Sequence, residues 1–263
     1  MPYIRMGVYL CAALYAAWYL TRFALSKPQA GLKHPSLFTL LRLGAGAAGL
    51  GLGITAGVFI AAFVMTAPLG RSNPQSTPLM RLRGEESRLG ADFKSYEHFS
   101  PRLVDSLLIA EDPRFFEHQG FDLRNTLYAV ELNTRLGFGS YGGSTLTQQL
   151  ARTLYLDPRK TMTRKYLELC IALTMEQFLS KERILELYLN YAEWGLNMWG
   201  AVQASREYFG KDPIDLTDPE IAVLLSLLPA PRRLTPDNFM DDPAIYRRYR
   251  RLRGWQTHYP AVP

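Results

Sequence analysis

An uncharged run at residues 43–69 is the feature that most constrains what this chain can fold into. A transmembrane helix needs about 20 consecutive, mostly apolar residues, and this run is longer than that. We therefore predict a membrane-spanning helix at residues 43–69. Gly49, Gly53 and Gly57 recur at every fourth position. This spacing permits close packing against another helix, although glycine is also common in membrane helices in general.

A second apolar run occupies residues 6–21, between Arg5 and Arg22. It is short for a span, so a tilted span, an interfacial helix and a signal-peptide core all stay open. Its aromatic residues are more typical of a membrane interface than of a signal core, and no small-residue cleavage site follows it. We predict a membrane anchor over residues 1–70, with 43–69 as the main span and 6–21 as a candidate first span.

Charge on either side of the main span bears on its orientation. The segment between the two runs carries Arg22, Lys27, Lys33 and Arg42, which places it on the cytoplasmic side by the positive-inside tendency. Residues after 70 would then be extracytoplasmic, although further arginines follow the second run and oppose this. The net charge of +6 suits an anionic partner, and the membrane segment favours a membrane surface or an anionic substrate over nucleic acid.

Beyond residue 70 the pattern is that of a predominantly helical domain without a strand-rich region. A polar connector is followed by Ser100 and Pro101, which suit the N-cap and first position of a helix. Pro113 disfavours helix at Asp112, so the helix should end near Glu111. The helix macrodipole disfavours a negative charge at a C-terminus. A carboxylate held there suits a general base.

Residues 142–152, GGSTLTQQLAR, combine a glycine turn with two threonines, a serine, two glutamines and an arginine. An N-cap at Ser144 or Thr145 would open a helix here. The paired glutamines and Arg152 exceed what a cap needs, and a polar helix start beside a glycine turn suits a polyoxygenated or anionic ligand. The preceding glycine-rich residues, 136–143, are typical of a mobile lid.

A basic cluster at residues 159–165 leads into the next helix, where Arg164 and Lys165 share a face with Glu168. A solvated surface ion pair is the simpler interpretation of that segment alone. Further helices are predicted to begin at Ser180, at Thr217 with a capping box to Glu220, and at Asp242. The aromatic turn at residues 191–200 could line a pocket or cross between lobes. The last helix carries five arginines that we expect on a solvated or headgroup-facing surface: Arg247, Arg248, Arg250, Arg251 and Arg253.

Five groups of residues, taken in order, resemble the motifs of the peptidoglycan glycosyltransferases. The first motif is matched by Glu111, Asp112, Phe115, His118, Gly120 and Asp122, and the second by residues 143–152. The third is matched by Arg164, Lys165 and Glu168, and the fourth by residues 184–190. The fifth is matched by Gly200, Ala201, Ala204 and residues 208–211. Residues 191–195 resemble the monofunctional branch, so we expect no transpeptidase domain.

The resemblance implies a mainly α-helical fold, with a lysozyme-like head and a small membrane-associated jaw after the N-terminal anchor. We expect a connector at 71–90, the glycosyltransferase domain at 91–236, and a basic C-terminal helix and tail at 237–263. The implied location is the bacterial inner membrane, with the catalytic domain on the periplasmic side. Implied partners are lipid II, the nascent glycan strand, membrane lipid, and division or elongation proteins.

The implied reaction polymerises lipid II by inverting transfer of its disaccharide from undecaprenyl diphosphate to an acceptor 4-hydroxyl. By the same resemblance Glu111 is the general base and Glu168 the second catalytic carboxylate, a candidate ligand for Mg²⁺ or Mn²⁺. The substrate-binding residues it implies are Asp112, His118, Ser144, Thr145, Gln148, Gln149, Arg152, Lys160, Arg164 and Lys165. Inverting chemistry with a diphosphate leaving group suits one base and several cations.

Three positions depart from the family's pattern, because Leu167 and Tyr128 stand where a basic residue is common and Arg152 where lysine is frequent. These departures affect which cations hold the diphosphate, and leave both carboxylates in place. Two other functions stay open: a lytic muramidase, which would also use a Glu in a helical domain, and a non-catalytic scaffold derived from the family. A glycosyltransferase would consume lipid II, whereas a muramidase would consume polymeric glycan and a scaffold would consume neither.

Overall fold

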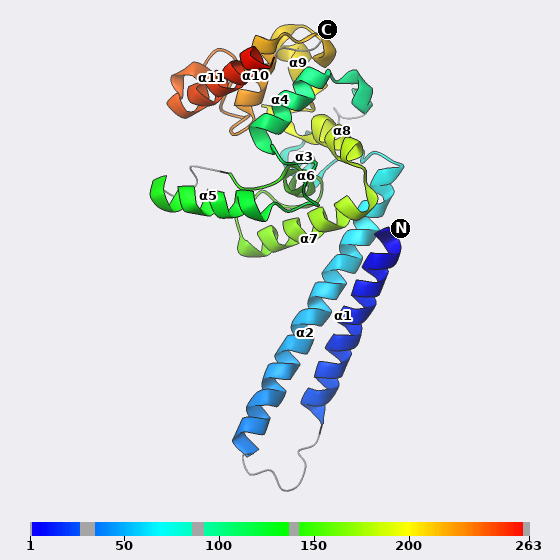
Figure 1. Cartoon of the computed structure of the whole chain (residues 1–263). Helices are drawn as coiled ribbons and strands as arrows, with labels where there is room; N and C mark the ends of the chain where they lie inside the picture. The colour runs from blue at the N-terminus through cyan, green and yellow to red at the C-terminus, as the bar shows by residue number, and fades with distance from the viewer. Residues whose placement is uncertain (1, 27–34, 86–91, 137–141, 260–263) are drawn as a thin grey trace. The chain divides into compact units, whose positions relative to one another are not determined.

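A computed structural model describes residues 2–26, 35–85, 92–136 and 142–259, and divides the chain into two compact units. Unit 1 comprises Met1–Pro68 and unit 2 comprises Leu69–Pro263. Figure 1 shows the helices of each unit. Residues 137–141 of the predicted lid, and the segment that holds Lys27 and Lys33, lie outside the described residues.

Unit 1 is a pair of packed helices, α1 (Pro2–Leu25) and α2 (Pro35–Thr66), which continues into the 3₁₀ helix η1 (Ala67–Gly70). Within the described residues, one stretch, Thr39–Gly70, is long and apolar enough to cross a membrane. This agrees with the predicted main span. Helix α1 covers the whole of residues 6–21, and in the part of the chain described the spanning stretch belongs to α2 and η1.

Only the first glycine of the predicted packing series lies against the neighbouring helix. A Cβ on Gly49 would sit 2.7 Å from Thr21 Oγ1 and 3.0 Å from the Ala17 carbonyl, whereas Gly53 and Gly57 have open space around them. The close contact of α1 with α2 therefore uses Gly49 and not the full series. Glycine permits this approach because it has no side chain to displace its neighbour.

Unit 2 is mainly helical, as the sequence predicted. Its elements are α3 (Pro78–Arg83), η3 (Tyr96–His98), α4 (Pro101–Glu111), α5 (Leu123–Leu136), α6 (Leu146–Tyr155), α7 (Met162–Phe178), α8 (Lys181–Tyr191), β1 (Glu193–Gly195), β2 (Met198–Trp199), α9 (Ala201–Phe209), η4 (Pro213–Asp215), α10 (Asp218–Leu227), η5 (Phe239–Asp241) and α11 (Pro243–His258). The aromatic turn at 191–200 forms a two-stranded antiparallel hairpin, the one sheet among the described residues.

Helix starts follow the predicted capping residues. The Ser100 hydroxyl accepts from the Leu103 amide, and Ser180 accepts from Arg183. Thr145, rather than Ser144, caps α6 and forms a capping box with Gln148. The predictions at Thr217 and Asp242 are also confirmed. At Ser100, Thr145, Ser180 and Asp242 the side-chain oxygen satisfies amides that the first helical turn leaves without partners. At Thr217 the bond runs the other way, from the Thr217 amide to Glu220 Oε2.

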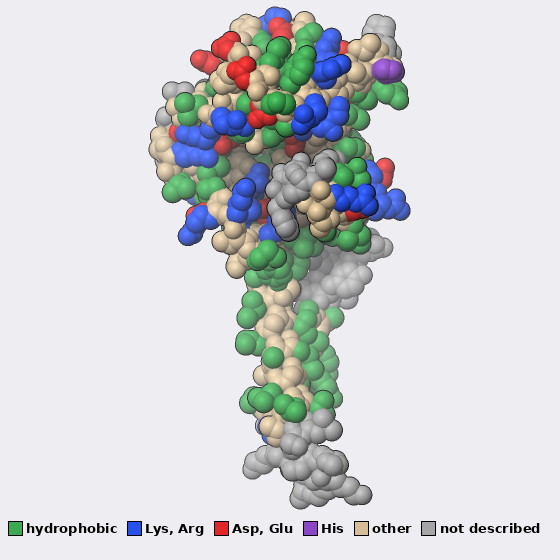
Figure 2. Space-filling model, turned by 90° about the vertical axis from the view of Figure 1, so that its left-hand side faces the viewer, with side chains coloured by type: hydrophobic (Ala, Val, Ile, Leu, Met, Phe, Trp, Pro, Cys, Tyr) green, Lys and Arg blue, Asp and Glu red, His purple; other side chains and the backbone are tan. Residues whose placement is uncertain are grey.

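The core of unit 2 is centred on α8, which packs against α6 and α9, while α10 packs against α4 and α11. Ile184, Leu185, Leu187 and Leu189 of α8 are fully buried. A helix that is apolar around most of its circumference belongs inside a domain, because no face of it can be left in water without cost. Figure 2 shows charged side chains scattered over the face of unit 2 in view, and little charge on the described surface of unit 1.

Candidate active site

Glu111 is the last residue of α4 and lies among side chains from two other helices. The helix ends as predicted, with Asp112 as its C-cap before Pro113. One carboxylate oxygen, Oε2, accepts a hydrogen bond of 2.9 Å from Gln149 Nε2 of α6. The other, Oε1, forms an ion pair with Arg248 of α11. Glu111 is therefore held by donors on both oxygens and still keeps about 14% of its side-chain surface exposed.

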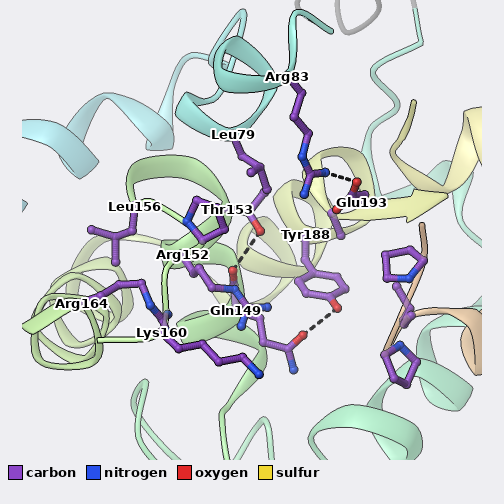
Figure 3. Close-up of a pocket in the computed structure, with 15 residues that line it drawn as sticks. Leu79, Arg83, Gln149, Arg152, Thr153, Leu156, Lys160, Arg164, Tyr188 and Glu193 are labelled. Atoms are coloured by element: carbon purple, nitrogen blue, oxygen red, sulfur yellow. Dashed lines mark hydrogen bonds and ion pairs between the residues drawn. The ribbon is translucent and has the colours of Figure 1, made fainter. Parts of the chain in front are cut away.

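Gln149 is in turn fixed by Tyr188, whose hydroxyl donates to Gln149 Oε1 over 3.0 Å (Figure 3). Burial raises the pKa of Tyr188 far above its usual value, and the charge of Glu111 raises it further. The tyrosine is thus a neutral donor, and it sets the orientation of the amide. With its oxygen occupied by Tyr188, Gln149 presents its NH₂ group to Glu111.

Gln149 and Tyr188 also line a cavity of about 250 Å³ between α6, α7, α8 and α3. Four cationic side chains share its lining: Arg83, Arg152, Lys160 and Arg164. Figure 3 shows Lys160 and Arg164 at one end of the view and Arg83, paired with Glu193, at the other. A pocket with this excess of positive charge suits an anionic ligand.

Glu168 is buried on α7, with 1% of its side chain exposed. It forms ion pairs with Arg164 and with Lys165, the latter at 2.6 Å. The simpler interpretation of this segment, a solvated surface pair, is therefore wrong. Lys165 also donates to Ser144 Oγ over 2.8 Å, which links α7 to the turn before α6. The third and second motifs thus meet at a buried charge that is paired on both oxygens, as such a charge requires.

Asp112 and His118 connect the first motif to the second inside the protein. His118 Nδ1 accepts from the Gly120 amide over 3.2 Å, and its Nε2 is hydrogen-bonded to Asp112 Oδ2 at 2.9 Å. Asp112 Oδ2 accepts from the Leu146 amide at the start of α6 over 2.9 Å. The Asp112 side chain is 1% exposed, and its oxygens are occupied by these internal bonds.

Thr145 and Gln148 have a similar internal role. Both are buried, and they cap α6 reciprocally. Thr145 Oγ1 also donates to the Gly120 carbonyl over 2.9 Å. Gly120 has a positive φ of 87°, and a Cβ there would lie 2.9 Å from the Ala172 carbonyl. Direct substrate contact by Asp112, His118, Thr145 and Gln148 gains no support from this geometry, because each side chain is buried and bonded within the protein.

The sequence did not indicate three residues of the site. Arg83 and Glu193 form an ion pair in the cavity lining across 110 positions of sequence. Arg248 belongs to the arginine-rich last helix, whose arginines we expected on a solvated or headgroup-facing surface. That prediction is wrong for Arg248, which is turned inward with about 15% of its side chain exposed, whereas Arg247, Arg250 and Arg251 are exposed.

The resemblance implies a divalent metal at this site. Among the described residues no three His, Cys, Asp or Glu side chains gather to hold a metal ion. Both oxygens of Glu168, the candidate ligand, are engaged by cationic side chains. The described residues therefore do not fit a metal held by the protein alone.

The helical domain thus links a hydrogen-bonded carboxylate, through Gln149, to a cavity lined by four cationic side chains, and this arrangement suits an anionic ligand. The chain belongs to the transglycosylase family, whose profile matches residues 76–253. This match covers all five motifs and confirms the resemblance. It also extends beyond residue 236 into α11, and therefore includes Arg248.

Curated relatives carry the same description. A biosynthetic peptidoglycan transglycosylase from Alcanivorax borkumensis is 42% identical over 163 residues, covering 62% of this chain and 66% of that protein. One from Azoarcus sp. is 42% identical over 168 residues, covering 61% of this chain and 73% of the relative. One from Aromatoleum aromaticum is 38% identical over 198 residues, covering 73% and 84%.

Proposed function

We propose that this chain polymerises lipid II into glycan strands during cell-wall synthesis. The observation that carries the proposal is the role of Gln149, which lines the cationic cavity and also bonds to Glu111. A diphosphate bound by the cavity cations would thus have a carboxylate nearby, in contact with the same glutamine. Family membership and the relatives' shared description support this choice of substrate.

In the proposed reaction Glu111 removes the proton of the acceptor 4-hydroxyl as that oxygen bonds to C1 of the donor sugar. The bond from C1 to the diphosphate oxygen breaks on the opposite face, which inverts the configuration. The electron pair leaves with undecaprenyl diphosphate, whose charge the cavity cations Arg152, Lys160 and Arg164 stabilise. Glu168 orients two cations, Arg164 and Lys165, through its ion pairs.

We further propose that the chain works at the bacterial inner membrane, with unit 2 on the periplasmic side. The spanning stretch Thr39–Gly70 supports membrane association. Within unit 2, α5 exposes large apolar side chains, namely Leu123, Leu127, Tyr128 and Val130. An exposed apolar patch of this kind suits contact with lipid, as the expected jaw would require. Division or elongation proteins are the proposed protein partners.

The decisive experiment is Glu111→Gln in the full chain, with purified lipid II. Glutamine keeps the side chain's shape and removes its basicity, and loss of a general base typically lowers the rate by about 10² to 10⁴. Glu117→Gln is the matched control, because it removes the same charge from the same motif at a side chain that is 68% exposed. Polymerisation should nearly vanish in the first variant and persist in the second.

Equal rates for the two variants would show that Glu111 is not the base. The alternative functions give different results in the same assay. A lytic muramidase would release fragments from polymeric glycan and leave lipid II intact. A scaffold would leave both substrates unchanged in the parental protein. Folding of each variant is checked from its far-ultraviolet circular dichroism.

A further inference from the structure

Arg248 brings the C-terminal helix into contact with the proposed base. Its guanidinium bonds to three acceptors at once: the Glu111 carboxylate, the Ala110 carbonyl at 3.2 Å and the Leu225 carbonyl at 3.3 Å. Glu111 and Ala110 end α4, and Leu225 lies in the last turn of α10. One side chain of α11 therefore joins the C-terminal ends of two other helices.

The side chain is aimed inward by the packing of its own helix. Ile245, Leu252 and Gln256 of α11 are buried, and Arg248 lies on the same face at helical spacing. Arg248 is consequently the arginine that reaches the interior, while its neighbour Arg247 is exposed. The rigid, planar fork of a guanidinium suits several acceptors at fixed positions better than an ammonium group does.

The local charges explain what such a contact does for Glu111. The last turn of a helix leaves carbonyls without partners and carries partial negative charge, so a carboxylate at the end of α4 is disfavoured by its own helix. From α6 the carboxylate faces the neutral amide of Gln149, with Arg152 further along that helix, and from α8 it faces Tyr188. In this set Arg248 is the cation that bonds to Glu111 itself.

We propose that Arg248 is a positioning residue for Glu111, and that the positive charge and hydrogen bond of Arg248 hold the carboxylate in place so that it can accept a proton. The proposal rests on the proposed function, in which Glu111 is the general base. A carboxylate has about four lone-pair sites, and Arg248 and Gln149 occupy one on each oxygen. Sites on both oxygens stay available for the proton of the acceptor hydroxyl. Helix α11 is thereby part of the active site.

The test is the pH dependence of kcat for the full chain at saturating lipid II. An opposite charge within a few ångströms shifts carboxylate ionisation by about 1 to 3 pH units. In Arg248→Ala the acidic limb of the profile should therefore move to higher pH by about 1 unit or more, with a loss of activity that is largest at low pH. Arg248→Lys keeps the charge and should move the limb by less.

Arg247→Ala is the matched control, because it removes the same charge from the adjacent, exposed position of the same helix. Its acidic limb should coincide with that of the parental protein. If Arg248→Ala does not fold, Arg248→Gln takes its place, since glutamine can donate hydrogen bonds without the charge, and the same shift is expected.

An acidic limb at the parental pH in the folded Arg248→Ala or Arg248→Gln variant would overturn the proposal. So would equal displacement of the limb by Arg247→Ala, because the effect would then be one of overall charge. Failure of the proposed function is distinguishable from these outcomes. If the proposed function fails, the parental protein itself leaves lipid II unchanged. If only the assignment of Glu111 as the base fails, Glu111→Gln polymerises lipid II at the parental rate.

Discussion

The cations that line the cavity differ in what else they bind. Lys160 is exposed and lies in the loop before α7, whereas Arg164 is paired with the buried Glu168. Removing Arg164 therefore weakens the support of a buried charge as well as any contact with substrate. The sequence placed these two residues in one basic cluster, and the structure gives them different expected phenotypes.

We predict that Lys160→Ala raises KM for lipid II about tenfold, the value of one charge-assisted contact, and leaves the melting temperature nearly unchanged. Arg164→Ala should raise KM and also lower the melting temperature. Arg159→Ala is the control, because Arg159 is in the same cluster with 82% of its side chain exposed. Steady-state kinetics and thermal unfolding of each variant provide the measurements. A parental KM in Lys160→Ala would remove this residue from the binding site.

At the scale of elements, three helices meet at the side chain of Arg102. It extends from α4, pairs with Asp218 at the start of α10 at 2.7 Å, and donates to the Gln256 carbonyl of α11. Its guanidinium also lies 4.9 Å from the centre of the Trp255 ring. The same α4–α10–α11 assembly carries Arg248, so this contact supports the geometry around Glu111.

The pH dependence of this contact follows from Asp218. The hydrogen bonds from Arg102 hold the pKa of the Asp218 carboxyl below its usual value. A lowered folded-state pKa contributes stability above the unfolded value of about 3.9, and this stability is lost as pH falls through the folded value.

We predict that Asp218→Asn lowers the melting temperature at pH 7 by about 2–4 °C, equivalent to roughly 1 kcal/mol for a partly exposed pair. The difference from the parental protein should narrow below about pH 4, as the parental Asp218 becomes protonated. Asp215→Asn, at an exposed position just before α10, is the control and should have little effect. A difference that is constant from pH 7 to pH 3 would contradict the assignment.

At the scale of the whole molecule, the proposed chemistry requires unit 2 to be where lipid II presents its disaccharide. We predict that a reporter active only outside the cytoplasm is active when fused after Pro263. A matched fusion after Arg42, ahead of the main span, should be inactive, because the preceding basic segment favours the cytoplasmic side. Activity of the second fusion and inactivity of the first would reverse the proposed topology.

Local features of the sequence predicted the helix ends that place the site. Ser100 with Pro101, and Asp112 with Pro113, fixed where α4 begins and ends, and hence put Glu111 at a C-terminus. The hydroxyls of Ser144 and Thr145 predicted the start of α6 to within one residue, and the cap is Thr145. Such signals are readable because each acts within one helical turn. The apolar run at 43–69 was equally informative, because length and composition alone decide whether a helix can span a membrane.

Tertiary structure decided which side chains the site uses and which it buries. From its own segment Glu168 could belong to an exposed ion pair or a buried one, and the tertiary structure shows it buried, with its partner Lys165 bonded to Ser144 ahead of α6. Glu111 and Arg248 are 137 positions apart, so no local pattern joins them. The five arginines of α11 are close together in the sequence, and what distinguishes Arg248 is that it lies on the face of the helix that meets the core. Sequence determined the elements because their signals are local, and the fold decided the contacts because burial depends on neighbours distant in the chain.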